Sequence, residues 1–226
     1  MGIGSSRHRA VALVGAVVVL TSAYAATPTS LIRSLAGAEV DWSAGTVTAS
    51  AGAAADMRMP SPAAARPGAE RRARAAAVEK LRAALRALPV RGKQRLEEKQ
   101  VEVALGHAST TRTEYQSNGG VVLWVGVKFE ELLESSSTAA TTTTTPTIPL
   151  ALAVGAMPLE LAPLLVSGGK EIVARHARYH QGPPPAGAIS VRRDDQGRLL
   201  LSQSSESTLD QLAGGPVVIY LQKILP

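Results

Sequence analysis

The sequence contains no cysteine, and this absence limits the ways in which the fold can be stabilised. Without thiols the chain forms neither disulfides nor thiolate metal sites, and it lacks the N-terminal cysteine that carries bacterial lipid anchors. Aromatic residues are also scarce, at 3% of the chain, although hydrophobic residues reach 45%. Because alanine supplies most of the excess, we expect a thin core of alanine, valine and leucine.

Catalytic motifs are missing as well. The sequence has no Gly-x-Ser-x-Gly elbow, and the run from Gly168 to Lys170 lacks the upstream glycine and the following hydroxyl of a phosphate-binding loop. Asp194 and Asp195 are adjacent beside a turn glycine, which suits a solvated loop better than acid–base chemistry. We therefore predict that the protein is not an enzyme and uses no cofactor.

The first 25 residues have the order of a secretory signal peptide. Arg7 and Arg9 precede an uncharged apolar run at 10–20, and Ala23 and Ala25 provide a small-residue cleavage site. An uncleaved anchor is the alternative, but the run is shorter than the ~20 residues that span a bilayer. We predict cleavage after Ala25 and a periplasmic location, with outer-membrane association as a further option.

The rest of the chain predicts an α+β fold, in which one long helix packs across a mostly antiparallel sheet. We expect a flexible leader at 26–38 and a single domain at 39–226, interrupted by a disordered loop at 135–147 that includes five consecutive threonines. Residues 148–166 are apolar but rich in proline, which predicts irregular chain. Alternating residues and turn residues predict strands at 39–42, 46–50, 110–116, 121–129, 188–192, 199–203 and 216–221.

The strongest pattern is an amphipathic helix over about residues 67–89. Apolar residues recur there at spacings of three and four, and Pro67 suits a first helical turn. The apolar stripe consists of Ala73, Ala77, Val78, Leu81, Ala84, Leu85 and Leu88. Small alanines on the stripe allow the helix to lie close to a sheet, and Pro89 and Gly92 predict its end.

The order of these segments resembles a known family. The residues that carry the resemblance are Val40, Asp41, Trp42, Gly45, Val47, Ala49, Gly52, Ala65, Arg66, Ala69, Glu70, Ala73, Ala76, Lys80 and Leu81. In this order they resemble the N-terminal domain of flagellar assembly protein T and the small twenty-kilodalton outer-membrane lipoproteins. The resemblance covers about residues 39–90 and implies an envelope assembly module, associated with the flagellum in one branch of the family. The missing lipid-attachment cysteine departs from the lipoprotein pattern, so the resemblance does not imply lipid anchoring.

Positive charge is the one feature with several uses. The formal net charge is +6, and much of it lies on the predicted helix, where a solvated face is the ordinary explanation. Nucleic acid is an improbable partner for an exported chain without stacking aromatic residues near its arginines. The alternative is a binding module for peptidoglycan or anionic lipid. We select Trp42, Arg71, Arg74 and Arg82 as candidate residues of an interaction surface.

A second alternative is a metal-dependent enzyme. His176 and His180 are four residues apart, so on a helix both imidazoles would lie on one side, as in metal sites. No third ligand is evident, and Arg175 and Arg178 would repel a cation, so we predict no metal site. The function we expect is a non-catalytic, exported assembly or interaction module whose partners are other envelope proteins.

Overall fold

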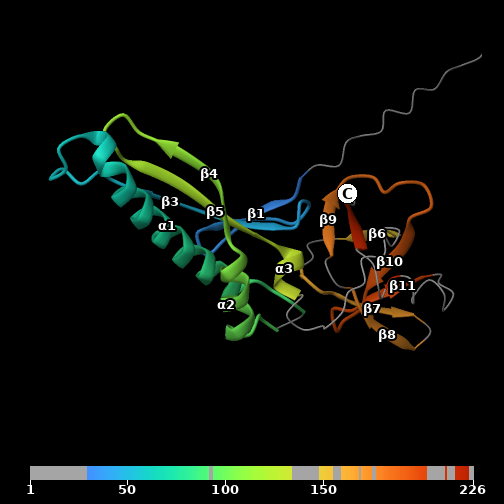
Figure 1. Cartoon of the computed structure of the whole chain (residues 1–226). Helices are drawn as coiled ribbons and strands as arrows, with labels where there is room; N and C mark the ends of the chain where they lie inside the picture. The colour runs from blue at the N-terminus through green and yellow to red at the C-terminus, as the bar shows by residue number, and fades with distance from the viewer. Residues whose placement is uncertain are drawn as a thin grey trace, which may run out of the picture.

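The structure is a computed structural model that describes residues 30–91, 94–133, 148–154, 159–167, 169–174, 177–202, 212 and 217–223. The predicted signal peptide at 1–25 and the predicted disordered loop at 135–147 lie outside the described residues. Helices and strands are arranged in two groups, each built on its own sheet (Figure 1). The predicted α+β class is therefore confirmed.

The first sheet has five strands, all antiparallel, in the order β1-β2-β3-β5-β4. They are β1 (Ile32–Leu35), β2 (Ala38–Asp41), β3 (Thr46–Ala53), β4 (Ser109–Tyr115) and β5 (Val121–Lys128). Side chains alternate between the two faces of β3: Val47 and Ala49 are buried on one face, and Thr46 and Thr48 are half-buried on the other. The strands predicted at 39–42, 46–50, 110–116 and 121–129 are present, and they pair as β2 with β3 and as β4 with β5.

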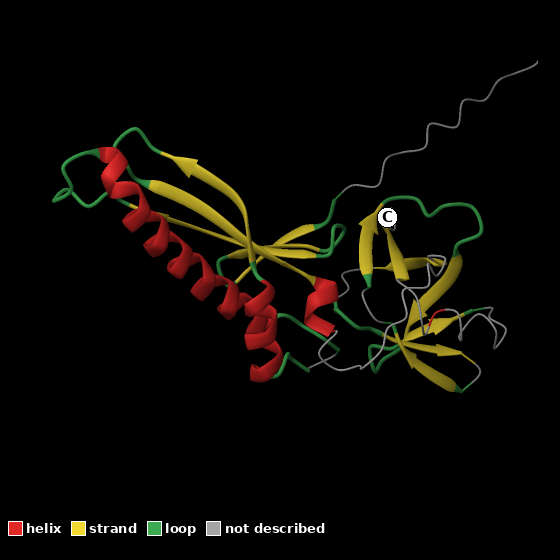
Figure 2. Cartoon of the chain, viewed as in Figure 1, coloured by secondary structure: helices red, strands yellow, loops and turns green. Residues whose placement is uncertain are grey.

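The long helix α1 (Pro62–Ala87) covers one face of this sheet (Figure 2). Its buried residues are Ala65, Ala69, Ala73, Ala77, Leu81, Ala84 and Leu85. This confirms the predicted packing of one long helix across the sheet, with small residues at the contact. In the part of the chain that the structure describes, no helix has both the length and the apolar character needed to cross a membrane.

The helix begins earlier than predicted. Ser61 caps it by accepting a hydrogen bond from the Ala64 N–H, and Pro62 occupies the first position, where a missing N–H is harmless. Pro67 therefore lies inside α1 rather than at its start. We call α1 with β3, β4 and β5 the arm, since it extends away from the second sheet (Figure 1).

Long side chains of α1 cover an open edge of the arm. β2 pairs with β3 only as far as Ala49, so among the described strands residues 50–53 have a partner on one side alone. The Lys80 ammonium donates to the Ser50 carbonyl oxygen at 2.9 Å, and the Arg72 guanidinium donates to the Ala54 carbonyl oxygen at 2.7 Å. These cations satisfy main-chain acceptors that a neighbouring strand would otherwise bind.

Two shorter helices complete the first group. α2 (Glu98–His107) starts with a capping box between Glu97 and Gln100, and it buries Val101 and Ala104. α3 (Phe129–Leu133) follows β5 directly and leads toward the second group. Together they close the end of the arm that lies nearest to the second sheet (Figure 1).

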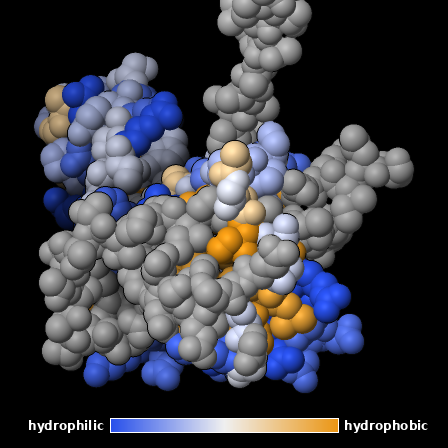
Figure 3. Space-filling view, turned by 90° about the vertical axis from the view of Figure 1, so that its right-hand side faces the viewer, coloured by the Kyte–Doolittle hydropathy of each residue, from blue (hydrophilic) through white to orange (hydrophobic). Residues whose placement is uncertain are grey.

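The second sheet has seven strands in the order β8-β7-β11-β10-β6-β12-β9 and mixes parallel with antiparallel pairs. Its strands are β6 (Ile148–Val154), β7 (Leu164–Ser167), β8 (Lys170–Val173), β9 (Arg178–Gln181), β10 (Ile189–Arg193), β11 (Leu199–Leu201) and β12 (Val217–Lys223). The three late strands predicted from alternation are present. Figure 3 views the molecule from the right-hand side of Figure 1. It shows apolar residues, in orange, at the surface among hydrophilic ones.

Two predictions for the strand regions are wrong. Irregular chain is predicted at 148–166, but β6 and β7 lie there. Pro149 is tolerated because it pairs only with β12, at Val218, whereas pairing with β10 begins at Leu150. The prediction of a flexible leader is wrong from Ile32 onward, because β1 pairs with β2 there. This pairing uses main-chain hydrogen bonds and therefore does not require apolar side chains.

Gly119, in the turn between β4 and β5, touches the start of α1. It has a φ of +83°, and a Cβ at this position would lie 2.6 Å from the Pro62 carbonyl oxygen. We expect Gly119→Ala to lower the free energy of unfolding by about 1–3 kcal/mol, measured by urea denaturation. Gly37→Ala is the matched control, because Gly37 has a φ of +82° but nothing within 4 Å of its Cβ position. Equal losses in the two variants would contradict a role for the Pro62 contact.

Candidate functional site

Trp42, selected from the sequence as a candidate surface residue, is buried at the junction between the two sheets. Its side chain is only 3% exposed. The indole meets the Phe129 ring edge-on at a centroid distance of 5.3 Å and the Tyr179 ring at 5.8 Å. Trp42 is therefore unavailable to a partner, and its role as an interaction residue is excluded in this structure.

Main-chain hydrogen bonds reinforce the junction. The Tyr179 N–H donates to the Trp42 carbonyl oxygen at 3.0 Å, and the Ser43 hydroxyl donates to the Tyr179 carbonyl oxygen at 2.7 Å. The Tyr179 hydroxyl in turn donates to the Glu160 carbonyl oxygen at 2.8 Å. Complete burial raises the pKa of the Tyr179 phenol, so this group stays protonated and acts as a fixed hydrogen bond.

Two of the candidate arginines hold α1 to its neighbours. The Arg74 guanidinium donates to the Thr110 hydroxyl at 2.8 Å. Arg82 forms ion pairs with Glu79 and with Glu102 of α2, the second at 3.2 Å. Hydrogen bonds to these two carboxylates raise the pKa of Arg82 above its ordinary value. Both arginines thus have intramolecular partners rather than open positions for a ligand.

The structure does not bring the four candidate residues together. Trp42 is buried at the junction, and Arg74 and Arg82 are occupied along the arm. Arg71 is exposed, and none of the interactions within the described chain involves its guanidinium. Among the four, only Arg71 is open to a partner.

The proposed histidine pair does not form a helical site. His180 lies in β9, and His176 lies outside the described residues. A spacing of four residues aligns side chains on a helix, whereas strand side chains alternate between faces. Within the described chain, no group of three His, Cys, Asp or Glu side chains is placed to hold a metal ion.

His180 is instead a half-buried strand residue beside Tyr220, with ring centroids 5.6 Å apart. Its Nδ1 is buried and has no hydrogen-bond partner among the described residues. Burial lowers the pKa of His180 below its ordinary value, with a smaller contribution in the same direction from Arg178, although Asp41 opposes the change. The imidazole is accordingly neutral at neutral pH.

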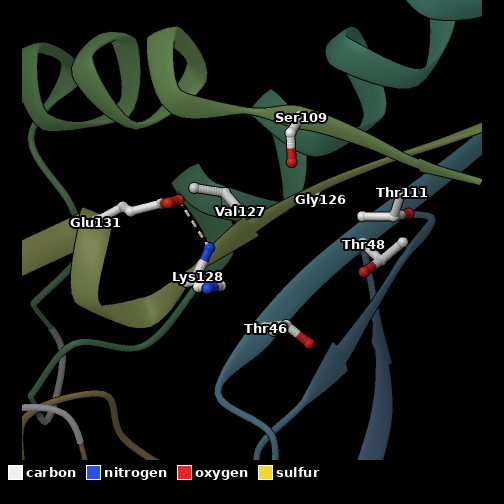
Figure 4. Close-up of a pocket in the computed structure, with 8 residues that line it drawn as sticks. All are labelled: Thr46, Thr48, Ser109, Thr111, Gly126, Val127, Lys128 and Glu131. Carbon is white, nitrogen blue, oxygen red and sulfur yellow. Dashed lines mark hydrogen bonds between the residues drawn. The ribbon is translucent and has the colours of Figure 1, made fainter.

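A furrow lies on the face of the first sheet opposite α1 (Figure 4). It encloses about 200 Å³. Hydroxyl groups from two strands dominate its lining, with two charged residues at one end. The lining residues are Thr46, Thr48, Ser109, Thr111, Gly126, Val127, Lys128 and Glu131.

Gly126 makes the furrow possible. A Cβ at this position would lie 3.2 Å from both the Thr48 hydroxyl oxygen and the Thr111 methyl carbon. The β4 register shifts between Thr110 and Arg112, so Thr111 occupies a bulge that re-aims its side chain over the furrow. Hydroxyl residues of β3 and β4 therefore lie on either side of a position in β5 that has no side chain.

Charged groups at the end of the furrow are partly occupied. The Glu131 carboxylate accepts a hydrogen bond from the Lys128 N–H at 3.0 Å, and so caps α3 (Figure 4). The furrow continues into a second hollow of about 580 Å³ near the junction, where Arg178 pairs with Glu130. The combined surface offers hydroxyl donors and acceptors, a lysine and an ion pair, which is suited to binding a polar ligand or segment.

At its other end the uncovered face carries an aromatic residue. Trp124 is half-buried, and the Arg112 guanidinium lies 4.7 Å from its ring centroid. This cation–π contact occupies one face of the indole. A partner in the furrow would meet Trp124 only at its remaining surface.

Sequence reasoning did not find the furrow. Two local signals were available: the outward threonines of β3, and Gly126 in the interior of a strand, where glycine marks a close approach or an open position. Neither signal shows which strands are neighbours. The pairing of β3 with β5 and of β5 with β4 is what brings Thr48, Gly126 and Thr111 together.

Trp42→Ala should remove the aromatic contact at the junction between the two sheets. We expect a loss of about 3–5 kcal/mol in the free energy of unfolding, since removing a buried aromatic side chain leaves a cavity that the surrounding structure fills only in part. Trp124→Ala is the control, because Trp124 lies on the uncovered face and is half-buried. Urea denaturation followed by far-UV circular dichroism measures both, and a loss in Trp42→Ala no greater than in the control would argue against the junction as the main support.

Comparison with known proteins gives no relative for this chain. No family model, no curated protein and no solved structure matches it. The resemblance to flagellar assembly protein T and to the small outer-membrane lipoproteins thus stays a prediction from the sequence.

Proposed function

We propose that the protein is a non-catalytic, exported module of the bacterial cell envelope that binds a protein partner in the furrow of its first sheet. The observation that carries this proposal is the furrow itself, which is lined by hydroxyls and left uncovered on the face opposite α1. The proposal places the protein in the periplasm, with outer-membrane association as a further option. A flagellar process is one branch of the resemblance to flagellar assembly protein T.

The furrow has the properties of a recognition surface. Its walls are formed by strands and therefore need little rearrangement when a partner binds. Its hydroxyls can both donate and accept hydrogen bonds, which suits the main chain or polar side chains of a protein segment. The junction with the second sheet lies at one end, so a bound segment would contact both halves of the protein.

The alternative function is binding of peptidoglycan or anionic lipid through the arginines of α1. The arrangement of the helix divides these residues into two classes. Toward its end, Arg82 and Arg86 pair with carboxylates of α2, and the hydrogen bond from Arg86 holds the pKa of Glu98 below its ordinary value. Near its start, Arg71 has no such partner among the described residues, so a basic binding surface would include that end.

Export is tested by the fate of the N-terminus. We expect the native gene product to accumulate in the periplasmic or outer-membrane fraction with Ala26 as its first residue, because signal peptidase cleaves after a small-x-small sequence. Mass spectrometry of fractionated cells measures this directly. Ala25→Arg is the control, since it should block cleavage without changing the mature domain. Intact protein confined to the cytosol would end the envelope proposal.

The furrow is tested by filling it. A photo-crosslinking residue at Thr111, on the furrow rim, should give a discrete protein adduct in cells, and Thr48→Tyr should abolish that adduct because the added ring occupies the hollow. Ser34→Tyr is the matched control, since Ser34 is exposed on β1 outside the furrow. Thermal unfolding should show that both variants remain folded.

Two outcomes would contradict a protein partner in the furrow. If the adduct persists in Thr48→Tyr at the level of the control, then the furrow is not the contact surface. If Thr48→Tyr instead abolishes retention of the protein by purified peptidoglycan sacculi, then the furrow binds glycan rather than protein, and the proposal of a protein partner is wrong.

A further inference from the structure

The outer end of the arm presents exposed apolar residues and positive charge together. We call this end the tip. It consists of the loop at 54–61, the first turns of α1, Tyr115 at the end of β4 and the turn at 116–120 (Figure 1). It is the part of the arm farthest from the second sheet, so it can reach a surface without obstruction from the rest of the protein.

Three of the five large hydrophobic residues that are exposed in the described chain lie at the tip. Met57 is 91% exposed, Met59 is 46% exposed and Tyr115 is 55% exposed. The loop is an ordered turn, because the Met59 N–H donates to the Asp56 carbonyl oxygen at 3.1 Å and the Arg58 N–H donates to the Asp56 carboxylate at 3.0 Å. Both methionines are therefore held outward by their own backbone.

Positive charge is concentrated at the same place. Residues 54–72 carry four arginines and two carboxylates. Arg58 and Arg71 are exposed, and in the part of the chain described here neither guanidinium has a hydrogen-bond or ion-pair partner. The arginines near the other end of α1 are paired with acidic side chains. Two cations that have no side-chain partner in the described chain thus lie near the apolar residues that project.

Tyr115 joins the two features. Its hydroxyl donates to the Glu70 carboxylate at 2.7 Å, and the Arg66 guanidinium lies 5.4 Å from its ring centroid. The ring remains more than half exposed despite both contacts. Tyrosine in such a position, apolar on one side and hydrogen-bonded on the other, suits the boundary between acyl chains and headgroups.

We infer that the tip docks the protein on an anionic lipid bilayer, with the two methionines among the acyl chains and Arg58 and Arg71 against headgroup phosphates. Peripheral proteins bind membranes through this combination of inserted apolar side chains and nearby cations. Outward-projecting, flexible thioethers suit a fluid surface better than a fixed groove. This inference does not depend on the furrow, since the tip and the furrow share no residue.

Vesicle co-sedimentation of the purified protein tests the inference. We expect binding to vesicles of phosphatidylcholine with phosphatidylglycerol and little binding to phosphatidylcholine alone, with a decrease as salt is raised. The double variant Arg58→Gln, Arg71→Gln should bind roughly fivefold more weakly for each arginine removed. The double variant Met57→Ser, Met59→Ser should lose binding by about tenfold or more, because apolar insertion is removed.

Matched controls separate the tip from general surface properties. Arg33→Gln with Arg192→Gln removes the same charge from exposed positions in β1 and β10, and Ile32→Ser removes an exposed apolar residue elsewhere. Thr48→Tyr should bind vesicles like the unmodified protein, so failure of the furrow proposal leaves this result unchanged. Equal losses in the controls and the tip variants, or no preference for anionic vesicles, would overturn the inference.

Discussion

Packing of the Trp42 indole against Phe129 and Tyr179 is the constraint on which the rest of the structure depends. Phe129 is the only phenylalanine of the chain, and Trp42 is one of its two tryptophans. Large aromatic side chains bury far more surface than alanine or valine, which form most of the remaining core. In a chain so poor in aromatic residues, three of its seven Phe, Trp and Tyr side chains meet at this one contact between the two sheets.

The position of the furrow follows from this junction. Phe129 begins α3 directly after β5, so anchoring its ring fixes the end of β5 that carries Lys128. A main-chain hydrogen bond from the Phe129 N–H to the Gly45 carbonyl oxygen, 2.8 Å long, fixes the start of β3 beside it. The contact between the two sheets therefore fixes β3 and β5, which form one wall and the floor of the furrow. The tip lies at the opposite end of the arm and does not depend on this contact.

The features that the sequence predicted are those encoded by local periodicity. Alanines and leucines at helical spacing identify α1, and alternation identifies β3, β5 and the late strands. Two of the errors occur where a partner distant in the sequence decides the structure. β6 exists despite Pro149 because β12, about seventy residues later, pairs with it. Trp42 is buried by a tyrosine of β9, and nothing in the residues near Trp42 indicates that contact.

In the candidate site, too, local features are visible in the sequence, whereas features set by distant contacts are not. The arginines of α1 are visible in the sequence, but whether each is free or paired depends on where α2 lies, and the sequence does not give that position. The furrow depends on three strands from two separate hairpins, so no single segment contains its pattern. His176 and His180 suggest a site only if the segment is helical, and His180 lies in a strand.

The open edge of β3 has a consequence for the behaviour of the protein in solution. Its carbonyl groups at Ser50 and Ala54 are covered by two cations on flexible stems, Lys80 and Arg72, instead of by hydrogen-bonded chain. Such a cover protects against sheet-to-sheet aggregation only while the amine remains charged. Acylation of Lys80 would therefore expose unpaired main-chain groups at the edge of β3 and promote edge-to-edge oligomerisation of molecules that are otherwise fully folded.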